Sequence, residues 1–200
     1  MDTRTRIVAA TGELFRRQGM AATGLKQIAK AAGATFGSIY HFFPGGKDEL
    51  ADEVIRSSGT AYGEHVMMIF DDSPDLLPAI EVAFAAAAAA LVEADYADAC
   101  PIETIALEVA STNERLRLAT AEVFTRWIED GTRRLPAPDL PEEVRRRLII
   151  GFVNSLEGAF VLSRALRSTE PLEAAGRMVM LAARAEMAEQ APRPRTADRR

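Results

Sequence analysis

Apolar residues recur at helical spacing along most of the chain, and no stretch alternates with the two-residue period of a strand. Turn signals rich in glycine, proline and aspartate separate the helical segments. Helices are predicted at residues 3–18, 25–32, 36–43, 48–70, 75–94, 102–111, 114–135, 142–166 and 172–189. The pattern predicts an all-α protein with a three-helix N-terminal domain (residues 1–47), a larger helical domain (48–190) and a disordered tail (191–200).

Residues 23–47 are predicted to form two short helices joined by a tight turn. Thr23 and Thr35 are the candidate N-caps, because a threonine hydroxyl can accept from the first free amides of a helix. Gly33 can adopt the left-handed conformation that closes the first helix. Pro44, followed by two glycines, ends the second helix.

Ala29, Gly33 and Ile39 distinguish this stretch from most helix pairs. Ala29 stands where two steeply crossed helices approach closely, Gly33 lies in the turn, and Ile39 faces inward from the second helix. This spacing meets the steric needs of a helix-turn-helix, whose second helix lies in the major groove of DNA. On these three residues alone, an ordinary helical hairpin without a ligand is an equal alternative.

A longer set of residues between Arg4 and Leu50 changes that balance: Ile7, Ala10, Leu14, Phe15, Gly19, Thr23, Ile28, Ala29, Ala32, Gly33, Ser38, Ile39, Tyr40, Phe43, Pro44, Lys47 and Leu50. In this order they resemble the DNA-binding domain of the TetR family of transcriptional repressors. The chain departs from the family pattern at Met20, Gly24 and Phe36, where an aromatic residue, Ser or Thr, and Lys or Arg are common.

The resemblance implies a partner, double-stranded DNA with a near-palindromic operator, and a role for each matching residue. Tyr40 and Lys47 are expected to hold phosphates, with Thr23 and Thr35 helping. The residues expected near base edges are Gln27, Phe36, Gly37, Ser38 and His41. Phosphate contacts would position the protein, and base contacts would select the sequence.

The charge distribution suits this interpretation better than the net charge of −5 does. Residues 1–60 carry +2, residues 61–190 carry −10 and the last ten residues carry +3. A small positive end on an acidic body fits a protein that presents that end to phosphates, although +2 over this length could arise by chance. The arginines of the tail could contact DNA or solvent.

The helix predicted at 48–70 is a mechanical link, because it starts beside the DNA reader and ends in the next domain. Residues 85–90 are an unbroken alanine run, which forms helix readily but buries little area. Either close packing or a cavity wall would suit the run. We expect a small apolar or aromatic effector in this region, lined by Tyr62, His65, Phe84, Glu108, Phe124 and Trp127.

Each of these candidates has a plainer alternative. His65 could be a packed or surface histidine, and Glu108 could be a surface carboxylate, since burying an unpaired carboxylate is costly. The aromatic residues could simply fill the core of a protein that has no effector.

The last two predicted helices carry more apolar surface than the rest of the chain can cover. Residues 148–162 are apolar almost all round, with a stripe of small residues formed by Gly151, Asn154, Ser155, Gly158 and Ala159. We therefore expect a homodimer through residues 142–189, in which the two helices form a four-helix bundle with their symmetry mates. A purely internal core is the alternative.

Further motifs lie in the second half: Cys100-Pro101-Ile102, Leu107-Glu108, Phe124 with Trp127, and Leu156-Glu157-Gly158-Ala159. With the segment 43–47 they resemble the TetR subgroup that includes lincomycin-resistance repressors. That resemblance implies a ligand-binding, dimerising C-terminal domain, and hence a repressor released from its operator by an effector.

Other classes of protein leave no signal. The two histidines and the one cysteine lie too far apart in the sequence to suggest a metal site. The sequence contains no cofactor-binding motif. It also contains no phosphate-binding loop and no nucleophile elbow that would indicate an enzyme. A helical small-molecule carrier or adaptor is the alternative, and only a regulator should shift a promoter duplex. The sequence contains one cysteine, Cys100, and no secretion signal. Its longest apolar run (82–92) is too short to span a bilayer. These features predict a cytoplasmic protein without membrane contact.

Overall fold

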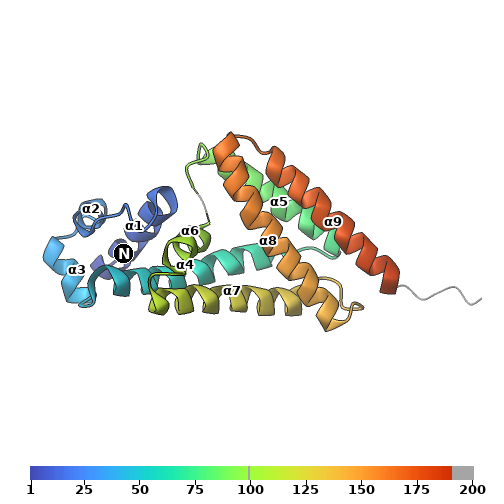
Figure 1. The fold of residues 1–200 in the computed structure, drawn as a ribbon, viewed down its shortest axis with the longest axis horizontal. Coiled ribbons are helices and arrows are strands. Elements are labelled where there is room, and N and C mark those ends of the chain that lie inside the picture. The colour runs from blue at the N-terminus through green and yellow to red at the C-terminus, as the bar shows by residue number, and fades with distance from the viewer. Residues whose placement is uncertain (99, 191–200) are drawn as a thin grey trace, which may run out of the picture.

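The computed structural model describes residues 1–98 and 100–190, so the predicted disordered tail lies outside the described part of the chain. The described residues form nine α-helices and no strand (Figure 1), which confirms the predicted all-α fold. The helices are α1 (Thr3–Gln18), α2 (Leu25–Ala31), α3 (Phe36–Phe42), α4 (Gly46–Asp71), α5 (Leu76–Glu93), α6 (Pro101–Val109), α7 (Glu114–Arg134), α8 (Glu142–Leu166) and α9 (Glu170–Gln190).

The molecule has two apolar cores, and the first lies between α1, α2 and α3. Ile7 and Phe15 of α1, Ile28 of α2 and Ile39 of α3 are fully buried in it. The same core continues into α4, α6 and the start of α7 through Leu50, Val54, Ile102, Ile105, Val109 and Leu116. The short helix α6 therefore packs directly on the helix-turn-helix domain.

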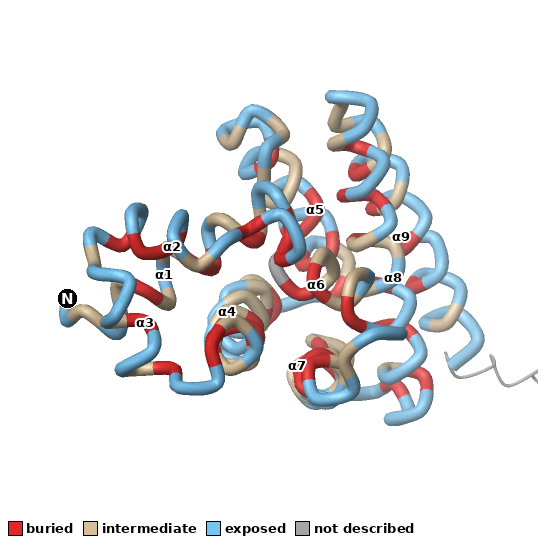
Figure 2. Tube along the Cα trace, turned by 60° about the vertical axis from the view of Figure 1, so that its left-hand side comes forward, coloured by how far each residue is buried: buried red, intermediate tan, exposed pale blue. Residues whose placement is uncertain are grey.

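The second core lies at the other end of the molecule, between α4, α5, α8 and α9 (Figures 1 and 2). Phe152 of α8 stands edge-on to Phe70 of α4 and Phe84 of α5, with ring centroids 5.4 and 5.3 Å apart. Gly176 lets α9 approach Phe84, because a Cβ at this glycine would lie 3.0 Å from the Phe84 side chain. This close packing accounts for one face of the alanine-rich helix α5.

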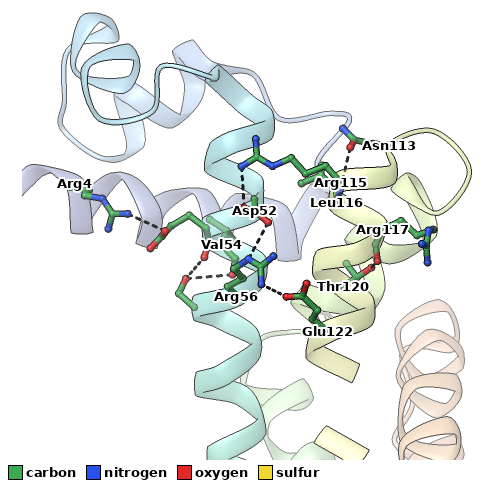
Figure 3. Close-up of polar contacts among 12 residues, drawn as sticks. Arg4, Asp52, Val54, Arg56, Asn113, Arg115, Leu116, Arg117, Thr120 and Glu122 are labelled. Carbon is green, nitrogen blue, oxygen red and sulfur yellow. Dashed lines mark hydrogen bonds and ion pairs between the residues drawn. The ribbon is translucent and has the colours of Figure 1, made fainter. Parts of the chain in front are cut away.

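Helix α4 connects the two cores, as its predicted length and position require. Polar contacts tie its first half to α7 (Figure 3). Asp52 accepts from Arg115 at 3.0 Å and from Arg56 at 3.2 Å, and Arg56 also pairs with Glu122. Such exposed pairs contribute only about 0.2–1 kcal/mol each, so apolar packing is the main source of stability here.

Helices α5 and α8 are long and apolar enough to cross a membrane by length and composition alone. Core helices of other proteins pass the same test. Here α5 packs against α4 and α9, and α8 packs against α7 and α9, so much of their apolar surface serves helix packing.

Candidate DNA-binding surface and effector cavity

Helix α3 presents its N-terminal half to solvent. Thr35 caps it, since its hydroxyl oxygen accepts from the Ser38 N–H at 3.2 Å, and the two hydroxyls are 2.7 Å apart. The exposed residues on this helix and its cap are Thr35, Phe36, Gly37, Tyr40 and His41, while Ser38 is half-buried. Ile39 is fully buried and fixes which face points outward. All the residues that the sequence placed on α3 therefore lie together on one accessible surface.

Helix α2 supports this surface from behind. Ile28 and Ala29 are buried against α1 and α3, and Gly33 has the left-handed φ of 58° that the sequence predicted for the turn. Gln27 is exposed and exchanges hydrogen bonds of 3.0 and 3.1 Å with Gln18 of α1. Lys47, in the first turn of α4, is half-buried.

Thr23 differs from the prediction. It is 1% exposed, and its hydroxyl donates to the Gly19 carbonyl at 2.6 Å instead of accepting from the amides of α2. Gly24 is the N-cap of α2 and supplies no side-chain hydrogen bond. Thr23 therefore does not cap α2, as the sequence had predicted. Because its side chain is buried in the turn before α2, it is also not available for the predicted phosphate contact.

A narrow cavity of about 40 Å³ lies between α4, α7 and α8. Tyr62 and Trp127 line it with ring centroids 5.5 Å apart, and Phe152 and Glu157 line it from α8. Trp127 is held in place because its Nε1–H donates to the Gly59 carbonyl at 2.8 Å. A space of this size admits only a few water molecules.

Tyr62 also borders a larger, open cleft of about 460 Å³ beside α4. His65, Cys100 and Phe160 line this cleft, and Arg16 reaches it from α1. A neighbouring hollow of about 90 Å³ is lined by Ala86, Ala87 and Ala90 of α5 and shares Tyr62 and His65 with the cleft. One face of the alanine run thus forms a cavity wall, while its other face packs on α9.

A polar cluster lies at the end of the narrow cavity, where α6 meets α8. Burial, reinforced by the nearby Glu103 carboxylate, raises the pKa of Glu157 to about 8. Burial also raises the pKa of the Cys100 thiol well above its ordinary value. Glu157 Oε2 is buried without a hydrogen-bond partner among the described residues. The cavity therefore contains one buried polar group with unused hydrogen-bonding capacity.

Two stretches of the chain match families of known proteins. Residues 7–54 match the family described as bacterial regulatory proteins, tetR family. Residues 77–178 match the family described as transcriptional regulator LmrA/YxaF-like, C-terminal domain. The chain belongs to the TetR family of transcriptional regulators. Its C-terminal part falls in the LmrA/YxaF-like subgroup, so the predicted resemblances to the TetR family and to this subgroup are both confirmed. The family and the relatives are transcriptional regulators and not enzymes.

Two relatives from Bacillus subtilis illustrate the match. The uncharacterized HTH-type transcriptional regulator YxaF is 33% identical over 86% of this chain and 90% of its own length. The HTH-type transcriptional regulator LmrA is 28% identical over 86% of this chain and 91% of its own length. The crystal structure of regulatory protein TetR from Rhodobacter sphaeroides has the same fold, with a TM-score of 0.80, 19% identity, and coverage of 89% of this chain and 97% of that one.

In this TetR-family chain, three of the six residues predicted to contact an effector line the narrow cavity or the open cleft. Tyr62 and Trp127 line the narrow cavity, and His65 lines the open cleft. Phe124 stands edge-on to Trp127 with ring centroids 5.4 Å apart but does not line either space, among the described residues.

Phe84 and Glu108 lie elsewhere. Phe84 is buried in the second core against Phe152 and Gly176. Glu108 faces the turn after α1, where its carboxylate accepts from the Ala21 N–H. The structure therefore corrects both as lining residues, since each side chain is already engaged by a neighbouring helix.

Sequence reasoning did not identify Glu157 as a candidate. Its signal is an acidic residue inside the long apolar run of α8. That signal does not show burial, because burial depends on helices that are distant in the sequence.

Helices α8 and α9 have exposed positions along their length (Figure 2), and several of these positions carry apolar side chains. At Gly151 and Gly158 of α8, an added Cβ would meet no atom of the described residues within 4 Å. Around them lie exposed apolar side chains: Ile150, Val161, Leu162 and Leu166 of α8, and Met178 and Leu181 of α9. A group of exposed apolar side chains of this kind indicates an interaction site.

Proposed function

We propose that this protein is a homodimeric, cytoplasmic transcriptional repressor that releases its operator when a small apolar or aromatic effector binds. The observation that carries the proposal is the exposed N-terminal face of α3, on which Thr35, Phe36, Gly37, Tyr40 and His41 lie together. The dimensions of B-DNA let such a helix enter the major groove. DNA-binding regulation follows from the family, while the direction of control and the effector are part of the proposal.

The family resemblance suggests the roles of the surface residues, and their exposure supports these roles. Tyr40 and Lys47 hold phosphates, assisted by Thr35. The side chains and backbone near base edges are Gln27, Phe36, Gly37, Ser38 and His41. The ring of Phe36 stands edge-on to that of Tyr40 at 5.5 Å, so the two rings approach DNA as one unit.

The partner for the uncovered face of α8 and α9 is a second copy of this chain. TetR-family regulators dimerise, and residues 142–189 supply a self-complementary face with two glycines that permit close approach. In the dimer the two α3 helices reach successive major-groove faces of a near-palindromic operator, about 34–36 Å or a multiple of it apart.

The effector site is the cavity between Tyr62, Trp127 and Glu157. The cavity is too small for an aromatic ring as it stands, so the effector requires α4, α7 or the Tyr62 side chain to move. Helix α4 also carries the helix-turn-helix domain, and an effector that favours the expanded arrangement shifts the whole protein toward it. A polar group of the effector would meet Glu157, which in its protonated form can both donate and accept.

Two measurements test the proposal. A duplex is first selected from a random-sequence pool by the unmodified protein, and failure to select any sequence would contradict the DNA-binding role assigned to α3. Aromatic compounds are then screened for a saturable change in the emission of Trp127, the only tryptophan. At saturation we expect the selected duplex to bind roughly 5–150-fold more weakly. A compound that saturates the signal and leaves DNA affinity unchanged would reject the coupling.

A further inference from the structure

The turn after α1 holds one directional contact between the helix-turn-helix domain and the rest of the molecule. Glu108, in the last turn of α6, accepts a hydrogen bond from the Ala21 N–H at 2.7 Å through Oε2. Its other oxygen, Oε1, lies over Gly19, where a Cβ would overlap it. Gly19 also has a φ of 82°. The carboxylate therefore occupies a notch that glycine leaves open.

Hydrogen bonds also fix the turn after α1 to the start of α2. The Thr23 hydroxyl donates to the Gly19 carbonyl at 2.6 Å, and the Thr23 N–H donates to the Met20 carbonyl at 3.1 Å. Gln18 donates to the Ala22 carbonyl at 3.2 Å and to Thr23 Oγ1 at 3.1 Å. A group that positions Gly19 and Ala21 thus also positions α2, and α3 packs directly on α2.

Other contacts between the same parts are less directional. The apolar residues of α6, Ile102, Ile105 and Val109, pack in the first core, but apolar burial has no preferred direction and tolerates small rotations. Arg16 and Arg17 pair with Asp98 at 3.6 and 3.4 Å, with partly exposed side chains. Arg4 of α1 also pairs with Glu53 of α4 at 3.0 Å, and both side chains are partly exposed. Ion pairs of these kinds contribute little. The Glu108–Ala21 hydrogen bond is exposed as well, but it is short at 2.7 Å and its acceptor is charged, which makes it stronger than a neutral hydrogen bond.

We propose that Glu108 is the positioning residue that sets the orientation of the DNA-binding domain relative to the helical body. Helix α6 also carries Glu103, which lies beside Glu157, and Glu157 lines the proposed effector cavity. A change at Glu157 that displaces α6 reaches the DNA-binding domain through Glu108, Gly19 and Ala21. Only this transmission step rests on the proposed function, while the positioning role rests on the contact itself.

The test measures orientation inside one chain. Nitroxide labels at Lys30→Cys on α2 and Glu93→Cys on α5, both exposed positions, report the distance between the two parts in full-length protein diluted with unlabelled protein. The native Cys100 is buried, and a chain without added cysteines measures its background labelling. The variants are Glu108→Ala, which removes the acceptor, and Glu108→Gln, which keeps an acceptor oxygen. Glu114→Ala is the acidic control, since Glu114 pairs with Arg117 inside α7.

We expect Glu108→Ala to broaden or shift the distance distribution and to weaken binding of the selected duplex about five- to tenfold, as loss of one hydrogen bond at an exposed position implies. Glu108→Gln should restore most of both properties, and Glu114→Ala should change neither. An unchanged distribution in Glu108→Ala, or an equal change in Glu114→Ala, overturns the proposal. If the unmodified protein selects no duplex but Glu108→Ala still shifts the distances and Glu108→Gln restores them, the positioning role stands and the proposed function fails.

Discussion

At the residue scale, the carboxyl of Glu157 is distinctive because one of its oxygens is buried without a hydrogen-bond partner among the described residues. Burial and the adjacent Glu103 raise its pKa to about 8, whereas a glutamate in the unfolded chain titrates near its ordinary value of about 4.3. Between these two values the folded protein binds more protons than the unfolded chain. The contribution of Glu157 to the free energy of unfolding therefore falls as the pH rises through this range.

The first prediction concerns Glu157→Gln, which imitates the protonated carboxyl. The free energy of unfolding of the unmodified protein should fall by up to about 1.4 kcal/mol per pH unit between roughly pH 5 and 8 because of this group. Urea titrations at pH 5.5, 6.5 and 7.5, at one fixed protein concentration, should show the variant gaining stability relative to the unmodified protein as the pH rises. Parallel curves for the two proteins would show that Glu157 does not titrate as its burial implies.

The second prediction concerns Gly63, where α4 meets Trp127. A Cβ at this position would lie 2.5 Å from Trp127 Nε1 and 2.6 Å from Cδ1. Gly63→Ala should displace the indole, disturb its hydrogen bond to the Gly59 carbonyl and cost about 1–3 kcal/mol of stability. Thermal unfolding and Trp127 emission measure both effects.

Gly37→Ala is the matched control for Gly63→Ala. In the described part of the chain, the one atom within 4 Å of a Cβ added at Gly37 is Thr35 Oγ1, at 3.9 Å. Because alanine favours helix over glycine, this variant should be neutral or more stable by up to about 1 kcal/mol. Equal losses in the two variants would mean that the Trp127 contact is not what Gly63 protects.

At the element scale, each helix of the DNA-binding domain has a separate task. Helix α1 supplies the apolar support, α2 sets the turn through Gly33, and α3 exposes the reading surface. The start of α4 adds Lys47 beside it. A change at Lys47 should therefore alter how tightly the domain holds the DNA backbone without altering which sequence it prefers.

The third prediction compares Lys47→Ala with Tyr40→Phe on the selected duplex. Lys47→Ala should weaken binding to all sequences and lower the slope of affinity against salt by about one for each phosphate that the lysine neutralises. Tyr40→Phe removes one hydroxyl donor and should cost roughly 0.5–1.5 kcal/mol per subunit. Arg133→Ala, on α7, is the basic control and should leave the slope unchanged. A Lys47→Ala protein with altered base preference and an unaltered salt slope would reverse the assigned role.

At the scale of the whole molecule, the arrangement of the two cores gives the protein its two ends. The first core joins the helix-turn-helix domain to α6 and the start of α7, while the second joins α8 and α9 to the end of α4. The exposed faces of α8 and α9 therefore lie at the opposite end of the molecule from α3 (Figure 1), and in the proposed dimer their pairing would set the separation of the two α3 helices.

The fourth prediction tests that pairing with Gly158→Trp. Gly158 has open space around it in the single chain, so the indole should leave the monomer folded but prevent close approach of a second α8. Sedimentation should show monomers, and the selected duplex should bind poorly. Glu129→Trp, at an exposed position on α7, controls for the added bulk. A Gly158→Trp monomer that binds DNA as well as the unmodified protein would sink the dimer model.

The sequence by itself determined the features that depend on local periodicity and turn chemistry. Helical spacing, the left-handed Gly33 and the stop at Pro44 act over a few residues, so the pattern alone places α1, α3 and α8. The residue set from Ile7 to Leu50 also determined the family, because its spacing reflects one packing arrangement. The outward face of α3 followed from the inward position of Ile39.

Tertiary structure alone decided which side chains are buried by distant helices. Glu108 of α6 reaches Ala21 in the turn after α1, and Phe84 fills a core closed by α9. Glu157 acquires its raised pKa because other helices bury it and α6 brings Glu103 beside it. These outcomes depend on crossing angles between helices remote in sequence, and the pattern along one helix shows an apolar face without showing what will cover it.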